Sequence, residues 1–140
     1  MTHHELEEGT VEALDFTKLN QIGQSGLQVI PAIAQDVETG DVLMMGYVNR
    51  EALEYAQKER KAVFWSTSRN ELWIKGLTSG NWLALEDIRV NCEQNSILYR
   101  VRLQGDGACH TLEEGQKKRH RRSCYYRRLR GDGSLEKIEE

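Results

Sequence analysis

Apolar and polar positions along the middle of the chain follow patterns typical of short strands. The final apolar run alternates with charged side chains, as a half-exposed antiparallel strand does. Pro31, in the first run, predicts a sheet edge or a break, because proline cannot donate a hydrogen bond to a strand ladder. The expected strands cover residues 27–36 (as one strand or two), 42–47, 62–66, 72–75 and 97–103.

One helix is expected among these strands. Asn49 is a suitable N-cap for a helix over 50–58, because its side chain can accept from a free N–H of the first turn. The inner face of this helix would carry Ala52, Leu53 and Ala56. The pattern predicts an α+β fold in which strands predominate.

Length and composition fit one compact domain, since the chain has 140 residues of which 39% are hydrophobic. The net charge of −3 hides an asymmetry, because the first fifteen residues contain no Lys or Arg and residues 117–130 are densely basic. We expect an acidic, solvated and partly mobile N-terminal tail over 1–20, a folded domain over 21–130, and a frayed polar C-terminal tail over 131–140. His3 and His4 receive no role.

The chain has three cysteines, Cys92, Cys109 and Cys124, each in a polar or turn-like setting. Three thiols suit a soft metal such as zinc and would leave a fourth position open for water, as in catalytic zinc sites. The alternative is that they are small buried hydrophobes, because no CxxC pair is present. No signal sequence or membrane-spanning run is visible, so we expect a cytoplasmic protein with reduced thiols and no membrane partner.

Several strings, in this order, carry a resemblance to a known family. They are Gln35-Asp36, Thr39-Gly40, VLMMGYVN over 42–49, Glu51-Ala52-Leu53, Phe64-Trp65-Ser66, Ser68-Arg69, LWIKG over 72–76, Thr78-Ser79-Gly80, Cys109-His110-Thr111 and Ser123-Cys124-Tyr125-Tyr126-Arg127. Over residues 30–128 the chain resembles the phosphoribosyl-AMP cyclohydrolase family of histidine biosynthesis. The order and density of the strings make this resemblance more specific than any single motif.

The resemblance implies a compact, intertwined homodimer with zinc at the subunit interface. Cys92 of one subunit would join Cys109 and Cys124 of the other. An odd number of cysteines is compatible with such a shared site, because a two-fold axis then gives two complete sites per dimer. The resemblance therefore favours zinc ligation over inert thiols.

The family's reaction is hydrolytic opening of the adenine ring of N1-(5-phosphoribosyl)-AMP. The resemblance implies that a zinc-bound hydroxide attacks C6 and that the N1–C6 bond breaks. His110, beside a metal ligand, is the candidate for proton transfer, the alternative being a surface histidine on a turn. His120, inside a basic run, is expected to be a plain surface residue.

The segment 73–80 resembles a nucleotide cradle, in which glycines allow close approach, polar groups donate to phosphate, and an indole stacks on a base. Arg69 would bind the second phosphate. Without the resemblance, Trp65 and Trp73 would be core residues. The candidate substrate-binding residues are Arg69, Trp73, Lys75, Gly76, Thr78, Ser79 and Gly80.

Departures from the family pattern cluster around the candidate site. The family carries Asp-Cys-Asp-x-Asp around its first zinc cysteine and holds magnesium there, whereas this chain has Asn91, Glu93 and Asn95 at the three positions. Magnesium prefers carboxylate oxygens, so the changes predict a weakened magnesium site. Thr67 replaces an expected arginine and Leu77 an expected glutamate.

The family's CHTGxxSC string is interrupted by an insert over 113–122. The basic run within it has three interpretations: a solvated loop, a nucleic-acid patch, or phosphate contacts that replace lost magnesium. A short run in an acidic chain argues against nucleic acid. On the third interpretation the phosphate contacts come from Lys117, Lys118, Arg121 and Arg122.

Three functions remain open from the sequence. The first is a phosphoribosyl-AMP cyclohydrolase with an altered second metal site. The second is a paralogue that hydrolyses another purine-type nucleotide or ring amidine. The third is a non-catalytic dimer that binds zinc or a nucleotide. The retained cysteines and His110 favour an enzyme, and the lost carboxylates favour the second or third reading.

Overall fold

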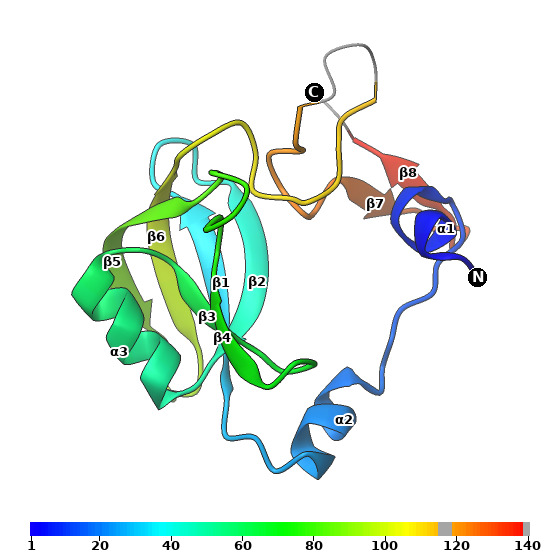
Figure 1. Ribbon diagram of the computed structural model, residues 1–140. Helices are drawn as coiled ribbons and strands as arrows, with labels where there is room; N and C mark the ends of the chain where they lie inside the picture. Colours follow the sequence, from blue (N-terminus) through cyan, green and yellow to red (C-terminus); the bar gives the residue numbers. More distant parts are fainter. Residues whose placement is uncertain (115–118, 139–140) are drawn as a thin grey trace.

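The computed structural model describes residues 1–114 and 119–138 as a strand-rich α+β chain (Figure 1). This confirms the expected fold class. The main sheet has four strands in the order β2-β1-β6-β5, with β1 and β6 parallel and the other neighbours antiparallel. The elements are α1 (His3–Glu8), α2 (Lys18–Gln24), β1 (Ile30–Asp36), β2 (Val42–Val48), α3 (Arg50–Glu59), β3 (Val63–Ser66), β4 (Glu71–Ile74), β5 (Leu83–Val90), β6 (Ile97–Leu103), β7 (Arg127–Leu129) and β8 (Leu135–Lys137).

The helix predicted after Asn49 is confirmed as α3. The Asn49 side chain accepts from the Ala52 N–H at 2.9 Å, which is the N-cap bond that the sequence predicts. Ala52 and Ala56 are completely buried against the sheet, and the helix ends at Arg60 in the left-handed region. The small alanines let α3 lie close to β2 and β3.

The sequence predicted a sheet edge or a break at Pro31, and neither is present, because β1 runs as one strand from Ile30 to Asp36 between β2 and β6. The pairing with β6 begins only at Ala32, one residue after the proline. Pro31 therefore needs no N–H on the β6 side, which is why a proline is tolerated at the start of an inner strand.

Strand β5 was not predicted, because its apolar alternation changes phase in the middle. Leu85 stands opposite Val101, and the register then shifts by one residue so that Ile88 stands opposite Tyr99. This β-bulge keeps both apolar side chains on the face shared with β6, although their spacing in the sequence is odd.

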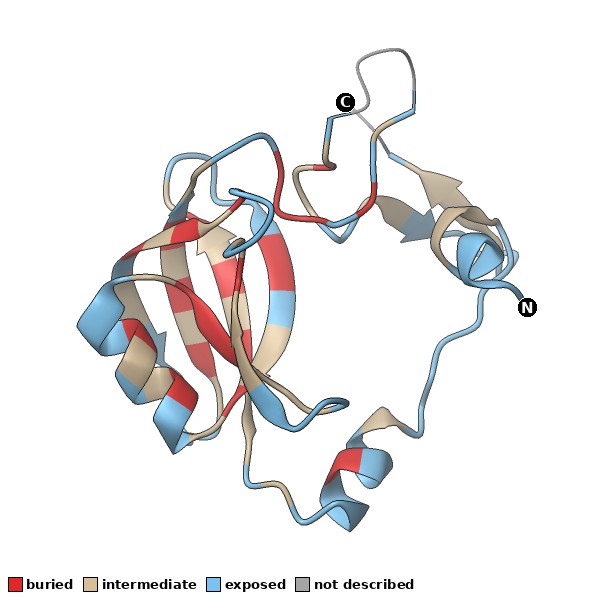
Figure 2. Cartoon of the chain, in the orientation of Figure 1, coloured by how far each residue is buried: buried red, intermediate tan, exposed pale blue. Residues whose placement is uncertain are grey.

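The core lies between the main sheet, α3 and the β3–β4 hairpin, where buried residues band the strands in Figure 2. Phe64 packs edge-on against Tyr99, with ring centroids 5.5 Å apart, and the Tyr99 hydroxyl donates to the Val63 carbonyl at 2.8 Å. A Cβ at Gly46 would lie 2.6 Å from the Phe64 ring. The glycine in β2 therefore makes room for the central aromatic residue.

The two ends of the chain also form structure. The acidic start, expected as a solvated tail over 1–20, contains α1 and the first residues of α2, and the expected frayed end contains β8, which pairs with β7. Helix α1 lies beside β7 and β8, away from the main sheet (Figure 1). Within the described residues, no helix is long and apolar enough to cross a membrane.

Candidate metal centre and active site

Cys109 and Cys124, fifteen residues apart in the sequence, form a thiol pair. Cys109 is buried, and a hydrogen bond from the Cys124 thiol lowers the pKa of Cys109 to about 5. The same bond raises the pKa of Cys124, so the pair shares one proton. The Thr111 hydroxyl lies 3.0 Å from the Cys109 sulfur and adds to the stabilisation of the thiolate. One thiolate is thus ready to bind a soft cation.

Backbone hydrogen bonds hold both cysteines in place. The Cys109 N–H donates to the Arg121 carbonyl at 3.0 Å, and the Cys124 N–H donates to Leu43 in β2 at 2.8 Å. A Cβ at Gly107 would lie 2.2 Å from the His120 carbonyl oxygen, so the loop before Cys109 approaches the insert closely. The two thiols lie together although an insert separates them in the sequence, as the loop argument predicted.

Lys75 points into the site from the end of β4. Its Nζ donates to the Asn81 carbonyl at 3.1 Å, and the side chain is buried. Burial lowers the pKa of Lys75, while the nearby charges of Cys124 and Cys109 raise it. Sequence reasoning placed Lys75 among the phosphate ligands and did not single out Asn81.

The rest of the predicted cradle is arranged differently. Thr78, Ser79 and Gly80 lie in an exposed turn, with polar groups open to solvent. Trp73 is half-buried and packs against Phe64, with ring centroids 5.6 Å apart. Arg69 is exposed on the β3–β4 turn and pairs with Glu71 at 3.5 Å. The structure therefore separates an exposed polar turn from a tryptophan that belongs partly to the core.

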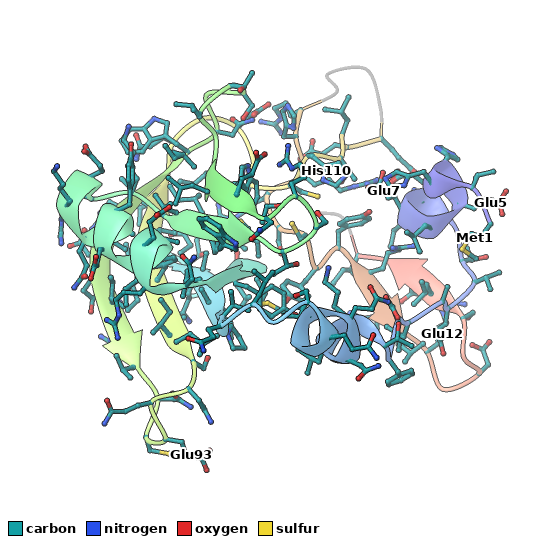
Figure 3. The ribbon with its side chains drawn as sticks, turned by 60° about the horizontal axis from the view of Figure 1, so that its bottom comes forward. Met1, Glu5, Glu7, Glu12, Glu93 and His110 are labelled. Atoms are coloured by element: carbon teal, nitrogen blue, oxygen red, sulfur yellow. The ribbon has the colours of Figure 1, made fainter. Side chains whose placement is uncertain are left out.

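His110 lies on the surface beside the thiol pair, where its Nε2 hydrogen-bonds with the Glu7 carboxylate of α1 (Figure 3). The Glu7 carbonyl accepts from the Tyr126 hydroxyl at 2.6 Å, so the helix is also tied to the segment after Cys124. The sequence analysis missed this contact. The only signal was the complementary charge of the acidic start and the basic insert.

Two arginines of the insert already have carboxylate partners. Arg121 is 2% exposed, and its guanidinium donates to both Glu8 oxygens, at 2.5 and 2.9 Å. Arg122 pairs with Asp36 and with Asp41. These contacts show that Arg121 is not solvated, and they argue against phosphate binding by the pair. Lys117 and Lys118 lie outside the described residues.

Cys92 lies in the β5–β6 turn, and Figure 3 shows Glu93 of this turn far from His110. Cys92 is exposed. In one chain it does not approach Cys109 or Cys124, and no group of three or more Cys, His, Asp or Glu within the described ranges could hold a metal.

The carboxamides of the same turn bond to one another. Asn91 Nδ2 donates to Asn95 Oδ1 at 2.6 Å, and Asn91 Oδ1 accepts the N–H groups of Asn95 and Ser96. Asn95 Nδ2 donates to the Glu93 carboxylate at 3.1 Å. The side chains at the family's magnesium positions thus stabilise the turn itself.

Fold and site together define a strand-rich α+β protein with a pair of thiols, one of them with a lowered pKa, next to a lysine and a histidine. Residues 44–126 match the family model described as phosphoribosyl-AMP cyclohydrolase. The chain belongs to the phosphoribosyl-AMP cyclohydrolase family, which confirms the resemblance found in its sequence.

Individual relatives agree. A phosphoribosyl-AMP cyclohydrolase of Chloroherpeton thalassium is 44% identical over 124 residues, which cover 89% of this chain and 79% of the relative. One from Chlorobium phaeovibrioides is 41% identical over 128 residues, covering 91% of this chain and 87% of the relative. One from Hyphomonas neptunium is 47% identical over 103 residues, with coverages of 74% and 72%.

Proposed function

We propose that this chain catalyses the reaction that gives its family its name: the hydrolytic opening of the adenine ring of N1-(5-phosphoribosyl)-AMP at the N1–C6 bond, in histidine biosynthesis. The observation that carries the proposal is the thiol pair of Cys109 and Cys124, with His110 beside it, in a chain of this family. A histidine beside an ordered thiol pair, one member of which has a lowered pKa, favours an enzyme over a non-catalytic zinc-binding protein.

The donor set fits zinc when a second copy is included. Cys109 and Cys124 supply two adjacent sulfurs, one of them already a thiolate near neutral pH. Cys92 is exposed on a distant turn, so it would serve as the third ligand in the partner's site. Bound there, zinc would lower the pKa of a coordinated water towards neutrality.

The extended N-terminal segment supports a homodimer. Val11, Leu14, Phe16 and Leu19 are between 59% and 89% exposed, which is unusual for apolar side chains so close together in sequence. A second copy that covers them would bury this apolar surface. We therefore infer an intertwined dimer in which each site is built from both chains.

The chain's own residues supply the remaining functions. His110 would move a proton between the reacting nitrogen and water, and its contact with Glu7 would fix the orientation of its ring. The exposed donors of Thr78 and Ser79, together with Arg69, would bind the substrate's phosphates. Magnesium remains a prediction, and the turn at Asn91 and Asn95 offers it few free oxygens.

The test is turnover of N1-(5-phosphoribosyl)-AMP by zinc-loaded protein, followed by ultraviolet absorbance, with and without magnesium. We expect ring opening in wild type and a loss of roughly 100-fold or more in His110→Asn. His4→Asn, on the exposed face of α1, is the matched control and should retain full activity. No turnover in either condition, with zinc bound stoichiometrically, would reject the proposed substrate.

A further inference from the structure

Lys75 is a buried cation whose charge needs a partner. The residue is 7% exposed, and within the described ranges no carboxylate forms an ion pair with it. An ammonium removed from water without a compensating charge is strongly destabilising. Burial lowers the pKa of Lys75, and the neighbouring Cys124 and Cys109 act in the opposite direction.

Asn81 fixes the ammonium relative to the cysteine loop. The Asn81 carbonyl accepts from Lys75 Nζ at 3.1 Å, and its side-chain oxygen accepts from the Asp106 N–H at 3.0 Å. Asp106 lies three residues before Cys109. Asn81, itself 4% exposed, therefore connects the lysine with the loop that carries the buried thiol.

Close packing around two glycines restricts the position of Asn81, which links Lys75 with the cysteine loop. Gly76 has φ +80°, and a Cβ there would lie 2.3 Å from the Asn81 backbone. A Cβ at Gly105 would lie 2.0 Å from the Asn81 side-chain oxygen. Gly76 lets the β4–β5 connection close on itself, and Gly105 lets the cysteine loop meet that connection at Asn81.

We propose that Lys75 is the counter-cation of the thiolate metal centre, held in position by Asn81, and that it is not a phosphate ligand. Three thiolates on a divalent ion leave one net negative charge, which a buried ammonium can offset. The inference rests on the zinc site of the proposed function. A phosphate ligand would need to meet substrate from solvent, as Thr78 and Ser79 do in their exposed turn.

The test is metal affinity in the full-length protein, with Co²⁺ as the spectroscopic probe and a chelator as competitor. Lys75→Met removes the charge, and Lys75→Gln removes the charge but retains a donor for the Asn81 carbonyl. Lys58→Met, on the exposed face of α3, is a matched control that makes the same change in net charge. Thermal unfolding of each metal-free variant checks that the fold is intact.

We expect both Lys75 variants to bind Co²⁺ and Zn²⁺ roughly 10- to 100-fold more weakly, while Lys58→Met stays at the wild-type affinity. Wild-type affinity in Lys75→Gln would overturn the inference, as would an increased KM with unchanged metal affinity. If wild type itself shows no thiolate-to-cobalt absorption, the zinc site of the proposed function fails and the inference fails with it. If wild type binds cobalt and the variants bind equally well, only the inference fails.

Discussion

The thiol pair and the β5–β6 turn differ in how much of each is built by one chain. Cys109 and Cys124 are anchored by backbone bonds to Arg121 and Leu43, residues that come from other parts of the fold. The turn that carries Cys92 is bonded mainly to itself, through Asn91 and its neighbours, and its thiol faces solvent. One region holds two sulfurs in place within the fold, and the other presents a single thiol outward.

On the proposed function, this contrast matches what each region would do in a site shared by two chains. Two ligands from one chain bind a metal more tightly when the fold already holds their side chains in place, because little conformational entropy is then lost on binding. A ligand that reaches into another subunit must be exposed in its own chain. The self-bonded turn keeps the Cys92 backbone fixed while leaving the sulfur accessible, so each region fits one half of a site completed by a second copy.

The largest expected effect comes from removing one sulfur from either region. Cys109→Ser and Cys92→Ser should each lower zinc affinity by at least roughly 100-fold, although the two residues are far apart in one chain. Metal content after dialysis against a chelator measures this. Ser96→Ala, in the same turn as Cys92, is the control and should retain zinc. A Cys92→Ser protein with full zinc occupancy would show that the turn plays no part in the site.

The next effect concerns the ion pair between Glu8 of α1 and Arg121, which precedes Cys124 in the sequence. Glu8→Ala removes the carboxylate that faces the buried Arg121 guanidinium, so we expect a loss of about 2 kcal/mol in the free energy of unfolding. Glu5→Ala, on the same helix without a side-chain partner in the described contacts, should change it by less than about 0.5 kcal/mol. Urea denaturation measures both. Equal effects would mean that α1 does not dock on the insert.

The same ion pair predicts a pH dependence. The Arg121 hydrogen bond lowers the pKa of Glu8 from 4.5 to about 2, so its stabilisation is complete above pH 4.5 and is lost as the pH falls towards 2. The difference in Tm between wild type and Glu8→Gln should therefore be constant above pH 4.5 and shrink below it. A difference that grew on acidification would contradict the assigned pairing.

The smallest effect concerns the outward-facing turn. Asn91→Asp combined with Asn95→Asp places three carboxylates together with Glu93, and we expect Mg²⁺ to raise the Tm of this variant by a few degrees more than that of wild type. Titration of the Tm with MgCl2, with NaCl at equal ionic strength as the control, measures this. An equal response in wild type would show that the carboxamide turn already binds magnesium.

Local signals in the sequence predicted most strands of the main sheet and singled out the cysteines and His110 as candidate site residues. Asn49 predicts its own helix because an N-cap is a contact between residues three apart, and the alternation over 97–103 reproduces β6. The cysteines and His110 stand in short strings whose chemistry is visible without a structure. Strand β5 was missed because a bulge after Leu85 shifts its apolar phase.

Contacts between distant segments were not predictable. The docking of α1 joins Glu7 and Glu8 to residues more than 100 positions away, and charge complementarity alone does not identify the pairs. Asn81, which holds the Lys75 ammonium, packs against Gly105 and accepts from the Asp106 N–H, 25 positions further along the chain. In both cases long-range packing decides which polar groups are buried.

The most direct measurement of the shared site is complementation between two inactive variants. In an equimolar, fully exchanged mixture of Cys92→Ser and Cys109→Ser chains, about half of the dimers are mixed, and each mixed dimer has one intact site. We expect recovery of about a quarter of the wild-type zinc and activity, and no recovery when Cys109→Ser is mixed with Cys124→Ser. Failure of the first mixture to recover, under exchange verified by mass-tagged chains, would contradict a metal centre built from both regions.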